Sequence, residues 1–416
     1  MIIQKAKSFQ RLFFLCFCLL LASCKLVKPI SEINMAHVYA RNSPASIRFA
    51  MAASPSSMLV FCRISFFNPE ISAEQPAFWE KYKLDFQVRS GYESSTCLFT
   101  DSIKPEMLIR GSGSSPIFQI SLPRTESDRV IFFRIRQRYA RDEYLFDCKI
   151  PGDEKAEPNP FCLFSAGGKM PVTENYARVG DTLMLRSFDY RKTSIQANFI
   201  PFSPAVAMPP MATVPLLETE SPQVYPVSID LNEPRVFKQP GYYFISDSAG
   251  KAGFGFAITA GDYPLLTTAS ELIDPMVYIS TRDERKTLLL ADNSKQALDQ
   301  FWLKISPLKD RARELIKKYF LNIEDANRYF TSEKQGWKTD RGMVMAIYGP
   351  PYLVFRNEDS ETWIYEKGTN LESTVFYFFR KKGDNYSDIW ELKRLGDYDR
   401  VWYGVVDLWR KGSIDR

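Results

Sequence analysis

The sequence predicts a mainly β protein with a C-terminal α+β module, arranged as two antiparallel β-sandwich-like domains followed by a helix-plus-sheet domain. Three observations support this fold class. The chain has 416 residues, which is too long for one ordinary domain. Apolar and polar residues alternate with a period of two in many short runs before residue 260, as in half-buried strands. Beyond residue 290 the apolar residues recur at steps of three and four, as on one face of a helix.

The first residues have the features of a bacterial lipoprotein signal peptide. An apolar run over 12–21, too short to span a bilayer well, follows a basic stretch that contains Lys5, Lys7 and Arg11. The run ends in Leu21-Ala22-Ser23-Cys24, which resembles the lipobox at which bacterial lipoproteins are cleaved and lipidated. We therefore expect a signal peptide over 1–23 and acyl chains, such as palmitate, on Cys24. The alternative is an ordinary secretory signal in which this cysteine occurs by chance.

The residues after Cys24 indicate where the protein is held. Lys25-Leu26-Val27-Lys28 lacks the aspartate that typically retains such proteins in the inner membrane of enteric bacteria. It also lacks the acidic run that resembles a surface-export signal. The expected location is the outer membrane, with the lipid-anchored body on the periplasmic face. Residues 24–43 are expected to be a tether, and His37, the only histidine, is expected to be incidental because a tether gives it no fixed partner.

Residues 44–165 are predicted to form the first β-sandwich-like domain. In the run over 81–89, apolar residues at even positions alternate with charged and amide residues. Clusters of turn residues, such as Pro151-Gly152-Asp153, separate this run from others like it. Three arginines share one face of a later strand: Arg134, Arg136 and Arg138. They could form a basic stripe that binds lipid phosphate or an acidic glycan. The alternative is a solvated face with no ligand.

The cysteines that follow Cys24 are Cys62, Cys97, Cys148 and Cys162. An oxidising compartment permits disulfides, and four thiols allow three full pairings. Cys62 and Cys148 alternate with apolar residues along their strands, so a buried thiol is the more common interpretation. The spacings do not resemble a zinc site, and with one histidine in the chain we expect no metal and no cofactor.

Residues 172–262 are predicted to form a second β-rich domain. Strands are expected over 182–188 and 194–199, and a hairpin over 241–258. Prolines recur between residues 201 and 226, and their density excludes a central strand or a helix. That stretch is therefore predicted to be a wrapping loop, an edge strand or a linker.

The chain then changes to a helical pattern. Asn293 or Ser294 can cap a short helix, and Ser306-Pro307 can start a longer one. The apolar residues between Leu308 and Phe330 form one wide stripe. The longer helix is therefore expected to lie against a core.

A distinctive motif follows this helix and carries a resemblance to a known family. Gly336-Trp337-Lys338-Thr339-Asp340 is followed by Arg341-Gly342, an apolar run over 343–348 and Gly349-Pro350-Pro351. Together with Ala326-Asn327-Arg328-Tyr329-Phe330 and the later strands, this order resembles the GWxTD domain, which we place at 265–416. The resemblance implies an envelope lipoprotein of the Bacteroidetes type with β-domains before the module. It supplies no reaction.

Two departures from the typical pattern bear on the charges of the module. Tyr352 stands where typical members carry an acidic residue, and Met343 stands where a second arginine often occurs. Both changes weaken any assignment of chemistry to those positions.

The first half of the motif can be interpreted physically. Gly336 permits a turn whose φ angle a side chain would resist, and Trp337 is a large anchor between helix and sheet. Thr339 or Asp340 can cap the next segment. Asp340 beside Arg341 suggests charge-assisted hydrogen bonds that hold the loop. These residues either form a recognition loop or lock the helix to the sheet, and the second role is the more common one.

The second half of the motif is predicted to be a buried strand. The run over 343–348 is short and apolar and ends in Tyr348, and Gly349 with Pro350 ends it sharply. Later strands are expected around Trp363 and over 375–379, the second of them paired with 388–392 in a hairpin.

Composition and residue usage restrict the function classes. The net charge of +5 is mild for this length, and no reader motif is present, so no nucleic-acid partner is expected. With no histidine in the predicted folded body, Ser–His, Cys–His and His–metal chemistry are excluded. A hydrolase that uses two carboxylates is the lesser enzyme hypothesis, with two clusters that could supply them: Glu358, Asp359 and Glu361, and Asp397 with Asp399.

The expected function is a non-catalytic binding or assembly subunit of an envelope complex. The expected partners are the membrane, through the N-terminal lipid anchor, and an envelope protein such as an outer-membrane barrel complex. The alternative is a glycan-binding lipoprotein that uses exposed aromatic residues near the C-terminus, which core packing would explain equally well: Trp402, Tyr403 and Trp409.

Overall fold

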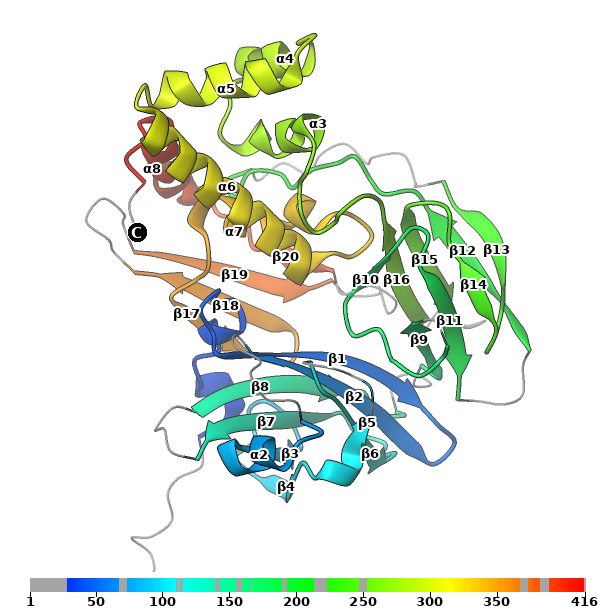
Figure 1. Ribbon diagram of the computed structural model, residues 1–416. Coiled ribbons are helices and arrows are strands. Elements are labelled where there is room, and N and C mark those ends of the chain that lie inside the picture. The colour runs from blue at the N-terminus through cyan, green and yellow to red at the C-terminus, as the bar shows by residue number, and fades with distance from the viewer. Residues whose placement is uncertain are drawn as a thin grey trace, which may run out of the picture.

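The computed structural model describes residues 28–66, 73–109, 111, 115–138, 143–154, 159–165, 167–188, 193–212, 223–246, 253–366, 373–381 and 389–414. The predicted signal peptide and Cys24 lie outside these residues. Among the residues that are described, no helix is both long and apolar enough to cross a membrane. The chain is mainly β and carries a C-terminal helix-plus-sheet region, which confirms the predicted fold class (Figure 1).

The first domain is a sandwich of two four-stranded antiparallel sheets. Leu84, Phe86 and Val88 are at most 2% exposed and face the core between the sheets, as their alternation predicts. One sheet has the order β1 (Ala45–Ala53), β2 (Ser57–Phe66), β6 (Ile117–Pro123) and β5 (Leu108–Ile109). The other has the order β4 (Cys97–Ser102), β3 (Tyr82–Arg89), β7 (Arg129–Gln137) and β8 (Glu143–Ile150). Two short helical segments join these strands, α2 (Pro76–Lys81) and η3 (Pro105–Met107).

The second domain is also a pair of sheets around its own apolar core. The smaller sheet has the order β14 (Pro234–Val236), β11 (Thr182–Ser187) and β9 (Phe161–Ser165). The larger has the order β10 (Tyr176–Arg178), β16 (Gly253–Thr259), β15 (Gly241–Ser246), β12 (Ser194–Ile200) and β13 (Tyr225–Asp230). All of these pairs are antiparallel except β10 with β16. β9 belongs here although residues up to 165 were assigned to the first domain, because β9 pairs with β11.

The proline-containing stretch has two of the forms expected for it. β13 contains Pro226 and is the outer strand of its sheet, where a missing N–H costs no ladder bond. Residues 201–212 wrap onto the C-terminal module instead: the Ala207 N–H donates to the Lys338 carbonyl at 2.9 Å, and the Leu395 N–H donates to the Pro210 carbonyl at 3.2 Å.

The C-terminal module consists of a four-stranded antiparallel sheet and the helices that cover it. The sheet consists of β17 (Leu353–Arg356), β18 (Ser360–Tyr365), β19 (Thr374–Arg380) and β20 (Trp390–Leu392). The helical segments are α3 (Ala269–Ile273), η4 (Asp274–Tyr278), α4 (Arg282–Leu289), α5 (Ser294–Ile305), α6 (Lys309–Phe330), η5 (Gly336–Lys338), α7 (Asp340–Tyr348) and α8 (Tyr398–Arg410). Asn293 caps α5, because its side chain accepts from the Gln296 N–H.

Two features of this module differ from the sequence-based prediction. The run over 343–348 is part of helix α7 and not a strand, because all of its residues are buried and a short apolar run shows no period that separates the two structures. α3 and α4 lie before residue 290, where no helix was predicted. Both are short and begin with a threonine capping box, at Thr268 and Thr281.

Residues 28–43 are not a tether. They contain two short helical segments, η1 (Ile30–Glu32) and η2 (Ala36–Val38), and Ile30 and Met35 are fully buried in the same core as the C-terminal module. This segment lies along the edge of β17. The Met35 N–H donates to the Val354 carbonyl at 2.8 Å, and the Val354 N–H donates to the Asn34 side chain at 3.0 Å.

The cysteines of the two sandwich domains are thiols and are not joined in disulfides. Cys62, Cys148 and Cys162 are buried free thiols, and Cys97 is an exposed one. Two arginines of the stripe pair with acids, Arg134 with Glu143 and Arg136 with Asp85, and Arg138 is exposed.

Candidate functional site

Gly336 lies where the chain passes too close to α6 for any side chain. A Cβ on Gly336 would lie 2.1 Å from the carbonyl oxygen of Ala326. Gly342 packs α7 against η5 in the same way, because its Cβ would lie 1.9 Å from the Gly336 carbonyl oxygen. Gly336 does not have a positive φ angle, so the prediction that its φ requires glycine is wrong. The close approach of η5 to α6 and α7 requires it instead.

Trp337 is the large buried side chain of the motif, with 2% exposure. Its backbone N–H donates to the Asn327 side-chain oxygen at 3.2 Å, and its carbonyl accepts from the Tyr278 hydroxyl at 2.8 Å. The Trp337 and Tyr278 rings meet edge to face at 5.9 Å. Trp337 therefore joins η5 to both α6 and η4.

Thr339 and Asp340 fix the start of α7. The Thr339 hydroxyl accepts from the Gly342 N–H at 3.0 Å and donates to the Gly336 carbonyl at 2.7 Å, which makes it the N-cap. Asp340 accepts from Arg394 through both carboxylate oxygens, at 2.7 and 3.1 Å. It also accepts from the Leu392 N–H at 2.7 Å, which ties α7 to the end of β20.

The predicted pair between Asp340 and Arg341 does not form, because neighbouring side chains on a helix point in different directions. Arg341 is 8% exposed and its guanidinium lies between two rings, 4.8 Å from the centre of Phe330 and 4.7 Å from that of Trp390. Its Nη1 lies 3.8 Å from a carboxylate oxygen of Glu361. Arg341 thus faces the sheet and lies next to Glu361.

Tyr348, Gly349 and Pro350 end α7. Tyr348 is 3% exposed and its ring contacts Tyr365 at 4.9 Å. Gly349 has a φ of 73°, in the left-handed region that favours glycine at the end of a helix. Its carbonyl accepts from the Tyr365 hydroxyl at 2.8 Å, and Pro350 follows where the helix cannot continue. This part of the motif connects α7 to β18.

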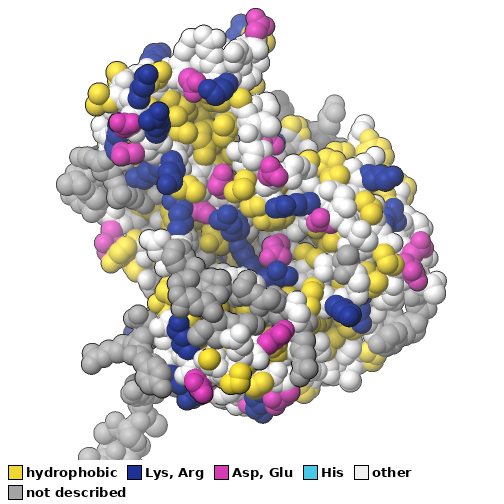
Figure 2. All heavy atoms as spheres, in the orientation of Figure 1, with side chains coloured by type: hydrophobic (Ala, Val, Ile, Leu, Met, Phe, Trp, Pro, Cys, Tyr) yellow, Lys and Arg dark blue, Asp and Glu magenta, His cyan; other side chains and the backbone are white. Residues whose placement is uncertain are grey.

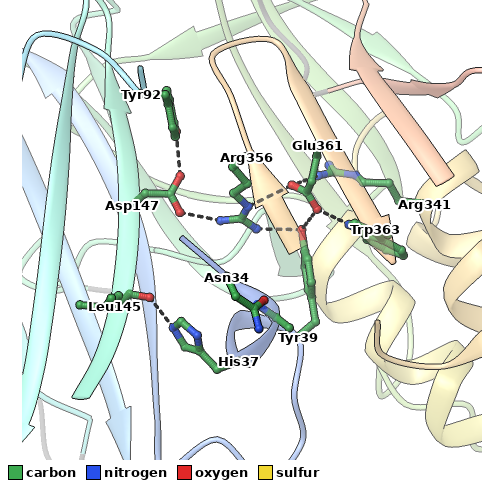
Figure 3. Close-up of polar contacts among 11 residues, drawn as sticks. Asn34, His37, Tyr39, Tyr92, Leu145, Asp147, Arg341, Arg356, Glu361 and Trp363 are labelled. Atoms are coloured by element: carbon green, nitrogen blue, oxygen red, sulfur yellow. Dashed lines mark hydrogen bonds and ion pairs between the residues drawn. The ribbon is translucent and has the colours of Figure 1, made fainter. Parts of the chain in front are cut away.

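A buried polar network lies where the first sandwich, the N-terminal segment and the C-terminal module meet (Figure 3). Arg356 of β17 is at its centre. It donates to Asp147 of β8 at 2.8 Å, to Glu361 of β18 at 3.0 Å and to the Tyr39 hydroxyl at 2.8 Å. The exposed fractions of these side chains are 16% for Arg356, 5% for Asp147 and 2% for Glu361.

The remaining oxygens of the two carboxylates are bonded as well. Asp147 accepts from the Tyr92 hydroxyl at 2.7 Å, and Glu361 accepts from the Tyr39 hydroxyl at 2.7 Å and from the indole N–H of Trp363. Burial raises the pKa of both Tyr39 and Tyr92, so these phenols stay protonated and act as donors. The two acids and Arg356 are therefore paired and hydrogen-bonded, which is the condition under which buried charges are tolerated.

Sequence reasoning missed this network because its members come from three separate segments. Alternation places Asp147 on the outward face of its sheet, which would normally be solvated. One signal was present: Val130 and Phe132 are apolar on the same outward face, and each is 2% exposed. Apolar residues on both faces of a strand indicate that both faces are covered.

His37 lies beside this network and has a fixed partner, so the prediction that it is incidental is wrong. Its Nε2 is hydrogen-bonded to the Leu145 carbonyl, and its ring meets Phe146 edge to face at 5.1 Å. Burial lowers the pKa of His37, and Arg356 lowers it further, while the Leu145 hydrogen bond and Asp147 act in the opposite direction. The neutral ring is therefore the form that the junction accommodates.

We expect acidification to destabilise the protein through His37. Because its folded pKa lies below the ordinary value of 6.5, the unfolded state binds the proton more tightly. The contribution of His37 is present above pH 6.5 and is lost as the pH falls through the lower folded pKa. The measurement is the urea midpoint between pH 7.5 and pH 5 for the wild type and His37→Asn, in which an amide replaces the titrating ring. The variant should lose less stability over this interval, and identical pH profiles would contradict the assignment.

The carboxylates considered for catalysis are dispersed. Glu358 and Asp359 lie at the surface beside Lys149, at 3.2 and 4.0 Å, whereas Glu361 belongs to the buried network. Asp397 and Asp399 are both exposed. Within the described part of the chain, no group of three or more His, Cys, Asp or Glu side chains could hold a metal ion.

The aromatic residues considered for glycan binding lie on α8. Trp402 and Trp409 are 4% and 0% exposed, and Tyr403 is 54% exposed. The Trp409 indole N–H donates to the Ile347 carbonyl at 2.9 Å, which fixes α8 against α7. The two tryptophans therefore belong to the core and do not form an exposed stacking surface.

Comparison with known proteins identifies the C-terminal part of the chain. No curated protein matches the sequence. The profile of the GWxTD domain family matches residues 241–411. The matched range starts at β15, earlier than the predicted start at 265, and includes the whole motif and the C-terminal sheet. Residues 241–411 of this chain are a GWxTD domain.

Proposed function

We propose that this chain is a lipoprotein anchored in the outer membrane through Cys24, and that it faces the periplasm as a non-catalytic binding or assembly subunit of an envelope complex. The lipobox-like end of the signal peptide supports the anchor, and the GWxTD domain supports an envelope lipoprotein, which is what the resemblance to that family implies. An envelope protein, such as an outer-membrane barrel complex, is the proposed partner.

The observation that carries the proposal is that the charged groups of the candidate site bind one another inside the protein. Asp340 is engaged by Arg394 and Leu392, and Arg356 is engaged by Asp147, Glu361 and Tyr39. A recognition loop or an active site would instead present such groups to solvent or to a cleft. The motif and the network hold the module in one arrangement with the first sandwich, which suits a scaffold.

Exposed apolar side chains supply a surface that a protein partner could cover. α4 and α5 project at one end of the molecule, and hydrophobic side chains reach the surface in that part of it (Figures 1 and 2). Four leucines on or beside these helices are 37–74% exposed: Leu289, Leu290, Leu303 and Leu308. Contacts between proteins are centred on apolar side chains of this kind.

The test is affinity purification of the full-length lipidated protein from membranes in mild detergent. We expect stoichiometric co-purification of an outer-membrane barrel or a lipoprotein set with the wild type, and its loss in the Leu289→Glu/Leu290→Glu variant. Val236→Glu is the matched control, because Val236 is 42% exposed on β14 in the second sandwich. A solitary wild-type protein would contradict the proposal, and retention of that protein on a glycan column would favour a glycan-binding role.

A further inference from the structure

The first described residues are fixed against one end of the first sandwich. The Lys28 carbonyl accepts from Arg89 at 2.9 Å, and the Ser31 N–H donates to the Tyr92 carbonyl at 3.2 Å. Arg89 ends β3, and Tyr92 lies in the loop that leads to β4. The chain therefore enters the fold beside the β3–β4 connection and not at a free end.

This entry point limits how far the body can move from an anchor at Cys24. Cys24 lies four positions before Lys28. A fully extended segment of that length spans about 14 Å at most. An acylated Cys24 would thus hold the β3–β4 end of the sandwich within that distance of the lipid headgroups.

The surface at this end is the exposed edge strand β4. Cys97, the first residue of β4, pairs with Arg89 of β3 in the sheet. β4 therefore begins beside the arginine that donates to the Lys28 carbonyl. Leu98 is 52% exposed and Phe99 is 39% exposed. Edge strands in soluble proteins usually carry charges rather than apolar side chains at such positions, because an apolar edge invites association.

We propose that Lys28, Cys97, Leu98 and Phe99, here called the β4 surface, rest on the bilayer that holds the acyl chains of Cys24. This inference rests on the proposed anchoring. Leu98 and Phe99 point to opposite faces of β4, so the edge of the strand would be turned to the bilayer and both side chains would reach the headgroup region, where apolar side chains gain from leaving water. The Lys28 ammonium would lie at the level of the lipid phosphates, to which a basic side chain is attracted.

The acidic side chains on and beside β4 have partners, and Asp101 of β4 lies 3.9 Å from the Lys104 ammonium. Glu93 is the acidic side chain of the β3–β4 loop, and it is held by hydrogen bonds from Ser31 at 2.9 Å and from Asn357 at 2.6 Å. Lys28 itself is exposed. The placement also orients the molecule, because β4 and the projecting helices α4 and α5 lie at opposite ends of it (Figure 1). The exposed leucines would then face the periplasm, where the periplasmic part of an envelope complex, and not its membrane-embedded barrel, would contact them.

The chain contains its own probe site for a test. Cys97 is exposed, whereas Cys62, Cys148 and Cys162 are buried. Burial raises the pKa of the Cys162 thiol to about 12 and raises the pKa of Cys62 and Cys148 as well, which keeps these thiols protonated and unreactive. A maleimide dye therefore labels Cys97 selectively in the folded protein.

The experiment uses the full-length lipidated protein in vesicles of phosphatidylethanolamine and phosphatidylglycerol. An environment-sensitive dye on Cys97 is quenched by lipids that carry a nitroxide at the headgroup. We expect loss of most of the Cys97 fluorescence, and little loss from the same dye in Cys97→Ser/Leu290→Cys, which places it at the opposite end. A twenty-residue Gly-Ser insertion between Val27 and Lys28 should restore part of the Cys97 signal, because it lengthens the connection.

The outcomes separate this inference from the anchoring itself. If the protein floats with the vesicles but the Cys97 dye is not quenched, or is quenched no more than the dye at position 290, the anchoring stands and the inference is overturned. If the protein does not float with vesicles, the proposed anchoring fails and the inference falls with it. Strong quenching at Cys97 alone supports both.

Discussion

Replacing Arg356 with methionine should lower the free energy of unfolding by about 3–5 kcal/mol, because it removes one partner from a buried ion-pair network. Asp147 and Glu361, with side chains 5% and 2% exposed, would lose the guanidinium that now contacts both, and of its basic partners Glu361 would retain only Arg341, at 3.8 Å. Methionine is of similar length, so the loss reports the unpaired charges more than a cavity. Urea unfolding of the mature protein at pH 7.5 measures it.

Two further variants make this expectation specific. Lys295→Met removes an ion pair with Asp299 whose lysine is 81% exposed, and it should change stability by about 0.5 kcal/mol or less. Adding Asp147→Asn and Glu361→Gln to Arg356→Met should recover part of the loss, because the two buried carboxylates that face Arg356 would then be uncharged. A loss below about 1 kcal/mol for Arg356→Met, the size of an ordinary substitution, would refute the role given to the network.

Gly336→Ala is expected to destabilise the protein by about 3 kcal/mol or more, the upper range for overpacking a well-packed site. The added methyl group would lie 2.1 Å from the carbonyl oxygen of Ala326 and 2.6 Å from the Cα of Asn327. Both are backbone atoms near the C-terminal end of α6, so no side-chain rotation relieves the overlap. η5 would have to move away from α6, and Trp337 would move with it. Thermal unfolding measured against the wild type gives the loss.

Gly404→Ala is the matched control for this substitution. Gly404 lies inside α8, and a Cβ built there has nothing within 4 Å. Alanine has the higher helix propensity, so this variant should gain up to about 1 kcal/mol. If Gly336→Ala were as well tolerated as Gly404→Ala, the close approach of η5 to α6 would not be the reason for the glycine.

The elements that were predicted correctly from the sequence are those whose formation depends on residues close together in the chain. The alternation through β3 and the stripe along α6 depend on neighbouring residues only, and both elements form, although α6 begins at Lys309 and not at the predicted Ser306-Pro307. The cap at Asn293 is local in the same sense. The GWxTD motif was also located from sequence, because its residue types occur together in order.

The features that sequence reasoning missed depend on contacts between distant segments. α7 was predicted as a strand because every residue from Met343 to Tyr348 is apolar, and only the surrounding α6, α8 and sheet explain why all sides are buried. The segment with Ile30 and Met35 is short and lacks a period. Its order comes from the β17 edge, whose Val354 it pairs with, and that edge lies more than 300 residues later in the chain.

The role of the charged motif residues also depends on contacts between distant segments. Asp340 and Arg341 are adjacent in sequence, but their partners are Arg394 and Glu361. Charges that seemed available for recognition are used to join α7 to the sheet. Only the three-dimensional arrangement distinguishes these two roles.

Hydrogen exchange of Arg356→Met is the most direct test of the central claim that the network makes the first sandwich and the GWxTD domain one rigid scaffold. The account predicts faster exchange in both partners of the junction, in residues 143–150 of β8 and 353–365 of β17 and β18, and in the 28–43 segment between them. Exchange in β12 and β13 of the second sandwich should stay unchanged. Faster exchange confined to 353–365, with β8 and the N-terminal segment as protected as in the wild type, would contradict it.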